Sequence, residues 1–494
     1  MALKINDILG TPHPTYDVQE LKLYDDLFSG GKQVLTQDYI FQHPMEKTAI
    51  YTARVKRADY CNYVRMILQQ IIDFVYRDNM IVREGIEDRF LNDVDLQGTD
   101  INAYMRHRGI RAMRDGHSFL PVDMIHIGAD VQSQADVREL GIRPYFTYID
   151  KIQLLNWGID RYGKLIWAVV YEQPEDPTTA SDERTETINI RLWETENGIV
   201  KWTLYQAKKS RWTMGRKISL REIRKIDEGQ NDMGVIPVVP LYADKIMAFQ
   251  SDSWIKDLAR TQRNILNTNS ELEELLRKTA VEILTIPYTG SDEDTGQIFK
   301  SSDYALLYNP IDTQGLAPDF ITATGRAAQS LFQRLEQQRN ELFRNLRQRL
   351  INTSASSDGS SGISKQEDFA STSTTLAFLA ASLEDAERRA WKLFYKFLGQ
   401  ENNNIIITYP RDFSVDAVER AIDRVDKITN QEVPDSLKQF AMSELAHQMM
   451  VGSAPMDEIR RVKMDIMNMK RMMNQNSVVG NPNSAMMDNN PNNV

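Results

Sequence analysis

The sequence predicts an α+β protein built from several domains, and three observations carry that prediction. The chain has 494 residues, and at roughly 100–200 residues per domain this length corresponds to about three domains. Runs rich in β-branched and aromatic residues lie between residues 145 and 205. In the second half, apolar residues instead recur every three or four positions over residues 253–278, 326–350 and 366–398, as in long amphipathic helices.

Composition excludes several classes of protein. The chain is 41% hydrophobic and 26% charged, and it contains no run of about 18 apolar residues, so we expect no membrane contact. Its first residues lack the apolar run of a signal peptide. The single cysteine, Cys61, excludes a disulfide framework and fits a reducing compartment. The net charge of −10 indicates that the chain either does not contact nucleic acid or handles it without tight binding, because proteins that grip DNA are usually basic.

The N-terminal part is predicted to be helical after a mixed start of about 45 residues. One helical face over residues 46–82 would consist of Tyr63, Ile67, Ile71, Phe74 and Val75. Cys61 falls in this stretch and is expected in core or interface packing. Helical signals continue weakly to Arg114. The segment from His107 to His117 is the densest in basic and histidine residues; we expect a solvated or interface face, with a ligand or catalytic role as the alternative.

A β-hairpin is the clearest local feature. Asn197-Gly198 favours a type I′ turn, so residues 188–196 and 199–206 are predicted to pair. Ile188, Ile190 and Leu192 alternate with more polar positions, as expected for a strand with one buried face.

The second half is predicted to consist of three long helices separated by short modules. Ser253 is a candidate cap for the first helix, which ends near Lys278. Residues 283–320, rich in proline and glycine, are expected to be mostly β or irregular. The second helix, 326–350, would span roughly 38 Å. A flexible Ser/Gly segment follows at 352–362, and Gly399 is expected to end the third helix.

The C-terminal part is helical and rich in methionine over residues 411–473, after a short apolar run at 405–407. This methionine density indicates either an adaptable partner surface or helical core, and the sequence leaves both open. Residues 474–494 are rich in asparagine and are expected to be disordered.

Three short segments resemble parts of nucleotide-binding or metal-binding motifs, but none has the full set of residues at the required spacing. Gly30-Gly31-Lys32 lacks the upstream glycine and the Ser or Thr of a phosphate-binding loop. The segment from Asp93 to Gly98 resembles the start of a calcium loop, but Tyr104 stands where the bidentate glutamate belongs. Residues 292–294 are three consecutive acids, which indicate a solvated turn more than a metal site. We therefore expect no enzymatic activity, no cofactor and no metal ion.

The order of segments is similar to that of the portal proteins of tailed bacteriophages: stem helix, clip, stem helix, tunnel loop, long wing helix and crown. Local sequence adds to the resemblance at residues 39–44, at 237–242 and at 362–365. Further matching positions are Glu46, Tyr51, Arg54, Arg57, Ala58, Asn62, Ser253, Leu258, Leu376, Leu383, Glu384 and Gly399. The matches cover roughly residues 30–400, and their order carries more weight than any single motif.

The resemblance implies a portal-type architecture with eight segments. These are a wing at 1–250, a first stem helix at 251–280, a clip at 281–325, a second stem helix at 326–350, a tunnel loop at 351–365, a long wing helix and following strand at 366–410, a helical crown at 411–473 and a disordered tail at 474–494.

It also implies a dodecameric ring at one capsid vertex, which serves as the channel for viral DNA packaging and ejection. Such a head–tail connector resides in the virion, after assembly in the host cytoplasm. Implied partners are other copies of the chain, the terminase motor, a head-completion or adaptor protein, a major capsid or scaffolding protein, and double-stranded DNA that passes non-specifically. Rival interpretations are another head–tail adaptor, which would be shorter, and a packaging enzyme, which would need a phosphate loop or a carboxylate–metal cluster.

Two groups of residues are candidate sites. The DNA-facing tunnel-loop group consists of Ser354, Ser356, Ser357, Asp358, Ser360, Ser361, Lys365, Arg344, Arg347 and Arg349; the partner-facing clip group consists of Asp292, Glu293, Asp294 and Lys300. The helix at 326–350 contains six Arg and two Glu. Its terminal arginines would form either salt bridges between subunits or contacts with phosphate in the channel.

Overall fold

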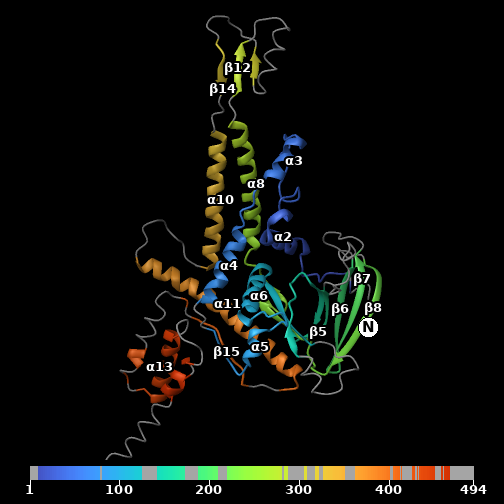
Figure 1. Ribbon diagram of the computed structural model, residues 1–494, viewed down its shortest axis with the longest axis vertical. Helices are drawn as coiled ribbons and strands as arrows, with labels where there is room; N and C mark the ends of the chain where they lie inside the picture. Colours follow the sequence, from blue (N-terminus) through green and yellow to red (C-terminus); the bar gives the residue numbers. More distant parts are fainter. Residues whose placement is uncertain are drawn as a thin grey trace, which may run out of the picture.

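Two long helices stand side by side and give the molecule its elongated shape (Figure 1). They are α8 (Lys256–Thr279) and α10 (Arg326–Leu350). Because the apolar stripes of both helices face inward, the side chains buried along the pair include Ile265, Leu272, Leu335 and Leu342.

A small sheet lies at the tip of this helix pair and connects the two helices in the chain (Figure 1). Its three strands are β12 (Ile283–Pro287), β13 (Ala305–Tyr308) and β14 (Asp319–Ile321), in the order β13-β12-β14. They agree with the small β module that the sequence predicts at 283–320.

The computed structural model describes most of the chain. The described residues are 9, 11–77, 81–124, 142–172, 187–209, 220–280, 283–287, 305–308, 317–321, 326–350, 362–400, 404–411, 413, 425–428, 431, 433–450, 458–459 and 461–467. Helices and strands are both well represented, so the α+β class is confirmed.

The N-terminal helices surround α8 and extend below it (Figure 1). They are α2 (Val18–Ser29), the short 3-10 helix η1 (Gly31–Gln33), α3 (Thr48–Arg57), α4 (Tyr63–Val75), α5 (Asp88–Asn92) and α6 (Ile101–Asp115). Of them, α2, α3 and α4 pack against α8. The helical stretch predicted at 46–82 is confirmed in α3 and α4, but it is interrupted: the chain breaks after Arg57 and restarts where the Asn62 side chain accepts a hydrogen bond from Arg65 N. Cys61 lies in this break and is exposed, so within the chain it is not core.

Two sheets flank this helical core. β2 (His117–Met124) pairs with β3 (Pro144–Phe146) and β9 (Val238–Tyr242), and α6 and the third long helix pack against them. The larger sheet, on the side of the molecule away from α10 (Figure 1), has the order β4-β5-β6-β7-β8. Its strands are β4 (Leu154–Ile159), β5 (Leu165–Glu172), β6 (Thr187–Glu196), β7 (Ile199–Lys209) and β8 (Leu220–Asn231).

The predicted hairpin is confirmed. β6 and β7 pair from Glu196–Ile199 outward, and Asn197 and Gly198 have φ of 52° and 82°, as a type I′ turn requires. The expectation of one buried face is wrong: Ile190 and Leu192 are buried on one face, but Trp193 is buried on the other, because both faces of the sheet are covered by separate apolar clusters.

We call the pair of α8 and α10 the stem. The third long helix, α11 (Gly362–Phe397), crosses beneath the lower end of this pair (Figure 1). It begins earlier than predicted, so residues 362–365 are helix and not loop. Gly399, with φ of 69°, follows its end as expected. β15 (Ile406–Thr408) then pairs with β1 (Val82–Glu84), and α13 (Asp435–Met450) lies in the C-terminal part.

The predicted cap of the first stem helix is also corrected. Ile255 is the cap residue of α8, and it makes no side-chain cap hydrogen bond. Ser253 is buried two residues earlier, where its hydroxyl accepts a hydrogen bond from Ile255 N at 3.1 Å and donates one to Arg114 O at 2.5 Å. Ser253 therefore anchors the start of the stem to α6. A small hairpin, β10 (Lys245–Met247) with β11 (Gln250–Ser251), precedes it.

Candidate functional site

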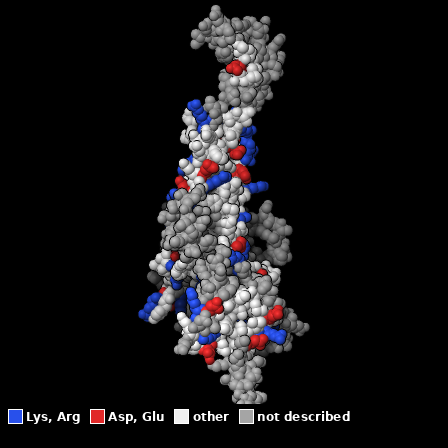
Figure 2. Space-filling view, turned by 90° about the vertical axis from the view of Figure 1, so that its left-hand side faces the viewer, with Lys and Arg blue, Asp and Glu red and all other residues white. Residues whose placement is uncertain are grey.

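The outer face of α10 is the part of the predicted DNA-facing group that the structure describes best. Leu335 and Leu342 point into the stem, whereas Phe332 is 50% exposed and Arg334 51% exposed on the outside. Arg344 is exposed near the lower end of the helix. Seen from the side that bears α10, the stem carries basic and acidic side chains along its length (Figure 2). Basic and acidic side chains are therefore mixed on this surface, as in the pair of Arg334 with Glu341 at 3.9 Å.

Most other predicted site residues lie outside the described part of the chain. Arg347 and Arg349 belong to α10 and Lys365 to α11, but their side chains are outside the described residues. The same holds for all of Ser354, Ser356, Ser357, Asp358, Ser360, Ser361, Asp292, Glu293, Asp294 and Lys300. The loop segment joins the lower end of α10 to the start of α11 in the chain.

An arginine clamp holds α8 to the segment before α3. The Arg54 guanidinium is buried and donates to both carboxylate oxygens of Glu46, at 2.9 and 2.8 Å. It also donates to Ser270 Oγ on α8 and to the Phe41 carbonyl, both at 2.7 Å. The Arg54 hydrogen bonds lower the pKa of Glu46 despite its burial. Glu46 and Arg54, which contributed to the family resemblance, thus fix the stem helix.

A second ion pair extends this clamp up the stem. Arg57 donates to the Glu274 carboxylate at 2.5 Å, and Glu274 is 9% exposed. Asn267 completes the contact from α8, because its side chain accepts from Phe41 N and donates to Tyr39 O, both at 2.8 Å. The upper part of α8 is therefore held by polar contacts as well as by the apolar stripe.

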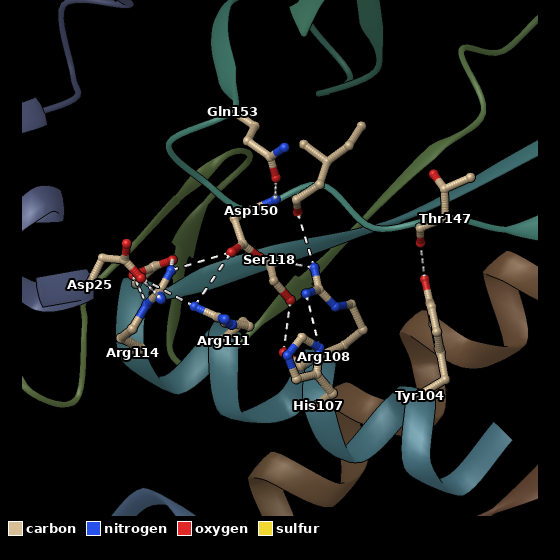
Figure 3. Close-up of polar contacts among 12 residues, drawn as sticks. Asp25, Tyr104, His107, Arg108, Arg111, Arg114, Ser118, Thr147, Asp150 and Gln153 are labelled. Atoms are coloured by element: carbon tan, nitrogen blue, oxygen red, sulfur yellow. Dashed lines mark hydrogen bonds and ion pairs between the residues drawn. The ribbon is translucent and has the colours of Figure 1, made fainter. Parts of the chain in front are cut away.

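A buried network of arginines and aspartates joins α6 to α2 and to the segment before β4 (Figure 3). Arg114 pairs with Asp115 at 2.6 Å and with Asp25 of α2, and Arg108 pairs with Asp150 at 3.1 Å. Arg108 and Arg114 are each only 1% exposed. Burial would raise the pKa of Asp150, but the charges of Arg108, Arg114 and Arg111 outweigh it, so the pKa is lowered and the carboxylate stays charged.

This network corrects the expectation for the segment from His107 to His117. Most of the segment is buried and is not a solvated face: Arg108 and Arg114 form ion pairs inside the core, and His117 is fully buried between Tyr16 Oη, at 2.9 Å from Nε2, and Ser251 Oγ, at 2.7 Å from Nδ1. Sequence spacing alone did not find the partners, because Asp25 and Asp150 lie far from α6 in the chain.

The acidic and histidine side chains of the described residues form no metal site. In that part of the chain, no group of three His, Cys, Asp or Glu side chains is placed to hold a metal ion. The carboxylates of the calcium-like segment accept hydrogen bonds from their own loop instead, Asp93 from Gly98 N and Asp95 from Gln97 N, both at 2.9 Å. Among the described helices, none combines the length and apolar character needed to cross a membrane.

Several methionines of the C-terminal part are exposed, whereas Met442 and Met450 are partly buried. Met449, Met464 and Met467 are each more than half exposed, and Phe440 of α13 is 61% exposed. In the chain by itself these side chains are therefore not helical core, which favours the partner-surface interpretation; Met469 lies outside the described residues.

Comparison with known proteins adds no relative. No family model matches the chain, and no curated protein matches it.

Proposed function

We propose that the chain is the portal protein of a tailed bacteriophage, the ring subunit through which DNA enters and leaves the capsid. One observation carries the proposal: a pair of stem helices bears a small sheet at its tip, and a long helix leaves the foot of the second stem helix beneath them. This chain order, with the five-stranded sheet as a wing and a helical C-terminal part, is the arrangement that the resemblance implies.

The width of the molecule indicates how such a subunit would sit in a ring. The circumference available to each subunit grows with distance from the axis, so the broad five-stranded sheet would lie on the outside. The side opposite this sheet, which would face the axis, bears α10 (Figure 1). Arg334 and Arg344 would then face the channel, and the segment between Leu350 and Gly362 would begin and end near it.

Exposed aromatic residues support assembly with further copies. Phe74 is 48% exposed, Phe332 50% and Phe378 71%, on three different helices. Single exposed apolar side chains are common on protein surfaces, so each of these would mark a contact only where a neighbouring copy covers it. Closed rings form when a surface on one copy meets a different surface on the next, and these aromatics lie at candidate contacts of that kind.

In this proposal, the protein forms a passage for DNA and does not itself catalyse a reaction. Other copies surround the channel, the clip meets the terminase motor and later a head-completion or adaptor protein, and the wing meets capsid or scaffolding protein. A net charge of −10 keeps the contact with the duplex weak, because a strongly basic lining would hold DNA with high, salt-dependent affinity.

Electron microscopy of the purified chain tests the proposal. We expect class averages of closed rings, twelve subunits in each, with a central channel. Mass photometry over a range of concentrations and salt gives an independent measure, and monomers under every condition would contradict the proposal. ATP turnover that co-purifies with the chain and disappears in Lys32→Ala would favour a packaging enzyme instead.

A further inference from the structure

The C-terminal end of α6 meets the segment that leads from the small hairpin of β10 and β11 into α8. We call residues 113–117 and 251–254 together the stem joint. Because α6 also packs against β2 and β9, the joint lies where the sheets and the stem come together. The proposed passage of DNA assigns no role to it.

The stem segment supplies hydrogen-bond donors to the end of α6. The last four carbonyl groups of a helix have no partner within the helix and need one elsewhere when they are buried. Here Trp254 N donates to the Met113 carbonyl at 3.0 Å, and Ser253 Oγ donates to the Arg114 carbonyl at 2.5 Å. The residues that precede α8 therefore cap α6.

Gly116 allows the two backbones to approach this closely. It follows α6 with φ of 90°, a conformation that glycine adopts readily. A Cβ atom at this position would lie 2.6 Å from the carbonyl oxygen of Ser251 and 3.0 Å from the carbonyl carbon of Asp252. Next to it, Ser251 Oγ lies 2.7 Å from Nδ1 of His117. The stem segment thus passes too close to α6 for a side chain at position 116.

Arg114 links the joint to other parts of the protein. Its guanidinium pairs with Asp115 at 2.6 Å, with Asp150 before β4 at 3.5 Å and with Asp25 of α2. Its carbonyl group accepts the Ser253 hydrogen bond described above. Because a buried charge is stable only beside its counterions, displacing the stem segment together with Arg114 would also disturb contacts with α2 and with the start of the five-stranded sheet.

We propose that the stem joint is a conformational device that holds the start of the stem rigidly against the sheets, so that stem and sheets move as one body. Met113 and Ile255 are 0% exposed and Trp254 is 7% exposed, so the joint is tightly packed. Ile255 makes no side-chain cap hydrogen bond to α8; the joint therefore fixes the position of this helix start. In a ring, which rests on the proposed function, the joint would set the inclination of the stem and with it the width of the channel.

Hydrogen–deuterium exchange on the full chain tests the inference with a matched pair of variants. Gly116→Ala introduces a Cβ atom into the close approach. Gly98→Ala is the control, because Gly98 also has positive φ, 82°, but no atom lies within 4 Å of its Cβ position. In Gly116→Ala we expect the amides of residues 251–262 to exchange at least about tenfold faster, through local opening, while those of β5 and β6 keep their rates. Gly98→Ala should leave the rates of residues 251–262 unchanged.

Two outcomes would overturn the inference: the same exchange over residues 251–262 in both variants, or a rise in Gly116→Ala that is spread evenly over the chain, which would mean general destabilisation. If Gly116→Ala does not fold, Ser253→Ala decides in its place, because it removes the hydroxyl but keeps the backbone; a smaller rise confined to the same residues is then expected, and no rise would refute the joint. Rings without the expected exchange pattern would refute only this inference, whereas that pattern without rings would refute only the proposed function.

Discussion

Arg83 and Glu387 form a two-point ion pair inside the protein. Nε of Arg83 lies 2.6 Å from Oε1 of Glu387, and Nη2 lies 3.0 Å from Oε2. Tyr409 Oη donates to the same carboxylate at 2.6 Å. Arg83 lies on β1, Glu387 on α11 and Tyr409 directly after β15, so these contacts tie the long helix to both strands of the β1–β15 pair.

Breaking this pair should destabilise the protein strongly. Glu387 is 0% exposed, so Glu387→Gln leaves the Arg83 charge buried without its counterion, at a cost of about 3–5 kcal/mol. Chemical denaturation measures the loss. Arg89→Ala, which removes an exposed ion pair with Glu87, should leave stability almost unchanged; a similar loss in both variants would contradict the argument.

Two substitutions on α10 should separate folding from assembly. Leu342 is 0% exposed, so Leu342→Ala should cost about 2–5 kcal/mol of stability through the cavity that it leaves. Phe332→Ser should leave the melting temperature of the monomer nearly unchanged but impair ring formation in mass photometry. Normal rings from Phe332→Ser would show that this side chain is not at an interface.

Stability should fall in mild acid, partly because of His117. Burial lowers the pKa of His117 well below its ordinary value of 6.5. As the pH falls through about 6.5, the unfolded chain takes up a proton that the folded chain refuses, so the folded state loses stability. Denaturation at about pH 7.5 and about pH 5.5, on either side of that value, should show a smaller loss for His117→Gln than for the unaltered chain. Equal losses would mean that His117 does not contribute.

A substitution of Arg344 can distinguish the two roles proposed for the terminal arginines of α10, which are contact with phosphate and a salt bridge between subunits. If it contacts phosphate, Arg344→Gln should leave rings intact and lower the affinity of the ring for duplex DNA, with a shallower dependence on salt. If it forms a salt bridge between subunits, the same change should instead weaken the rings at high salt. DNA binding and mass photometry on one preparation distinguish the outcomes.

The segment after α10 should serve translocation more than assembly. Ring symmetry would bring one copy from every subunit toward the axis, where many weak contacts can follow a sliding duplex. Deleting residues 354–361 should therefore leave rings intact but shorten the packaged DNA or reduce its retention. Full-length packaging and retention by this variant would count against the role, and failure to form rings would make the segment structural.

Local chemistry determined the parts of this protein that the sequence predicted well. The turn at Asn197-Gly198 depends on backbone preferences of two adjacent residues, and α10 follows from one apolar stripe between clear breakers, so its bounds agree with the prediction. The site residues in the Ser/Gly segment remain predictions, since they lie outside the described residues.

Tertiary structure decided what depends on distant partners. The arginines of α6 look like a solvated face in the sequence, but Asp25 and Asp150 neutralise them in the core. A cleft between α2 and α8 likewise exists only because these two helices pack against each other. Tyr24 and Arg263 both line it, although they lie 239 positions apart in the chain (263 minus 24). Burial of a charge is stable only with a counterion, and no local pattern states which remote residue supplies it.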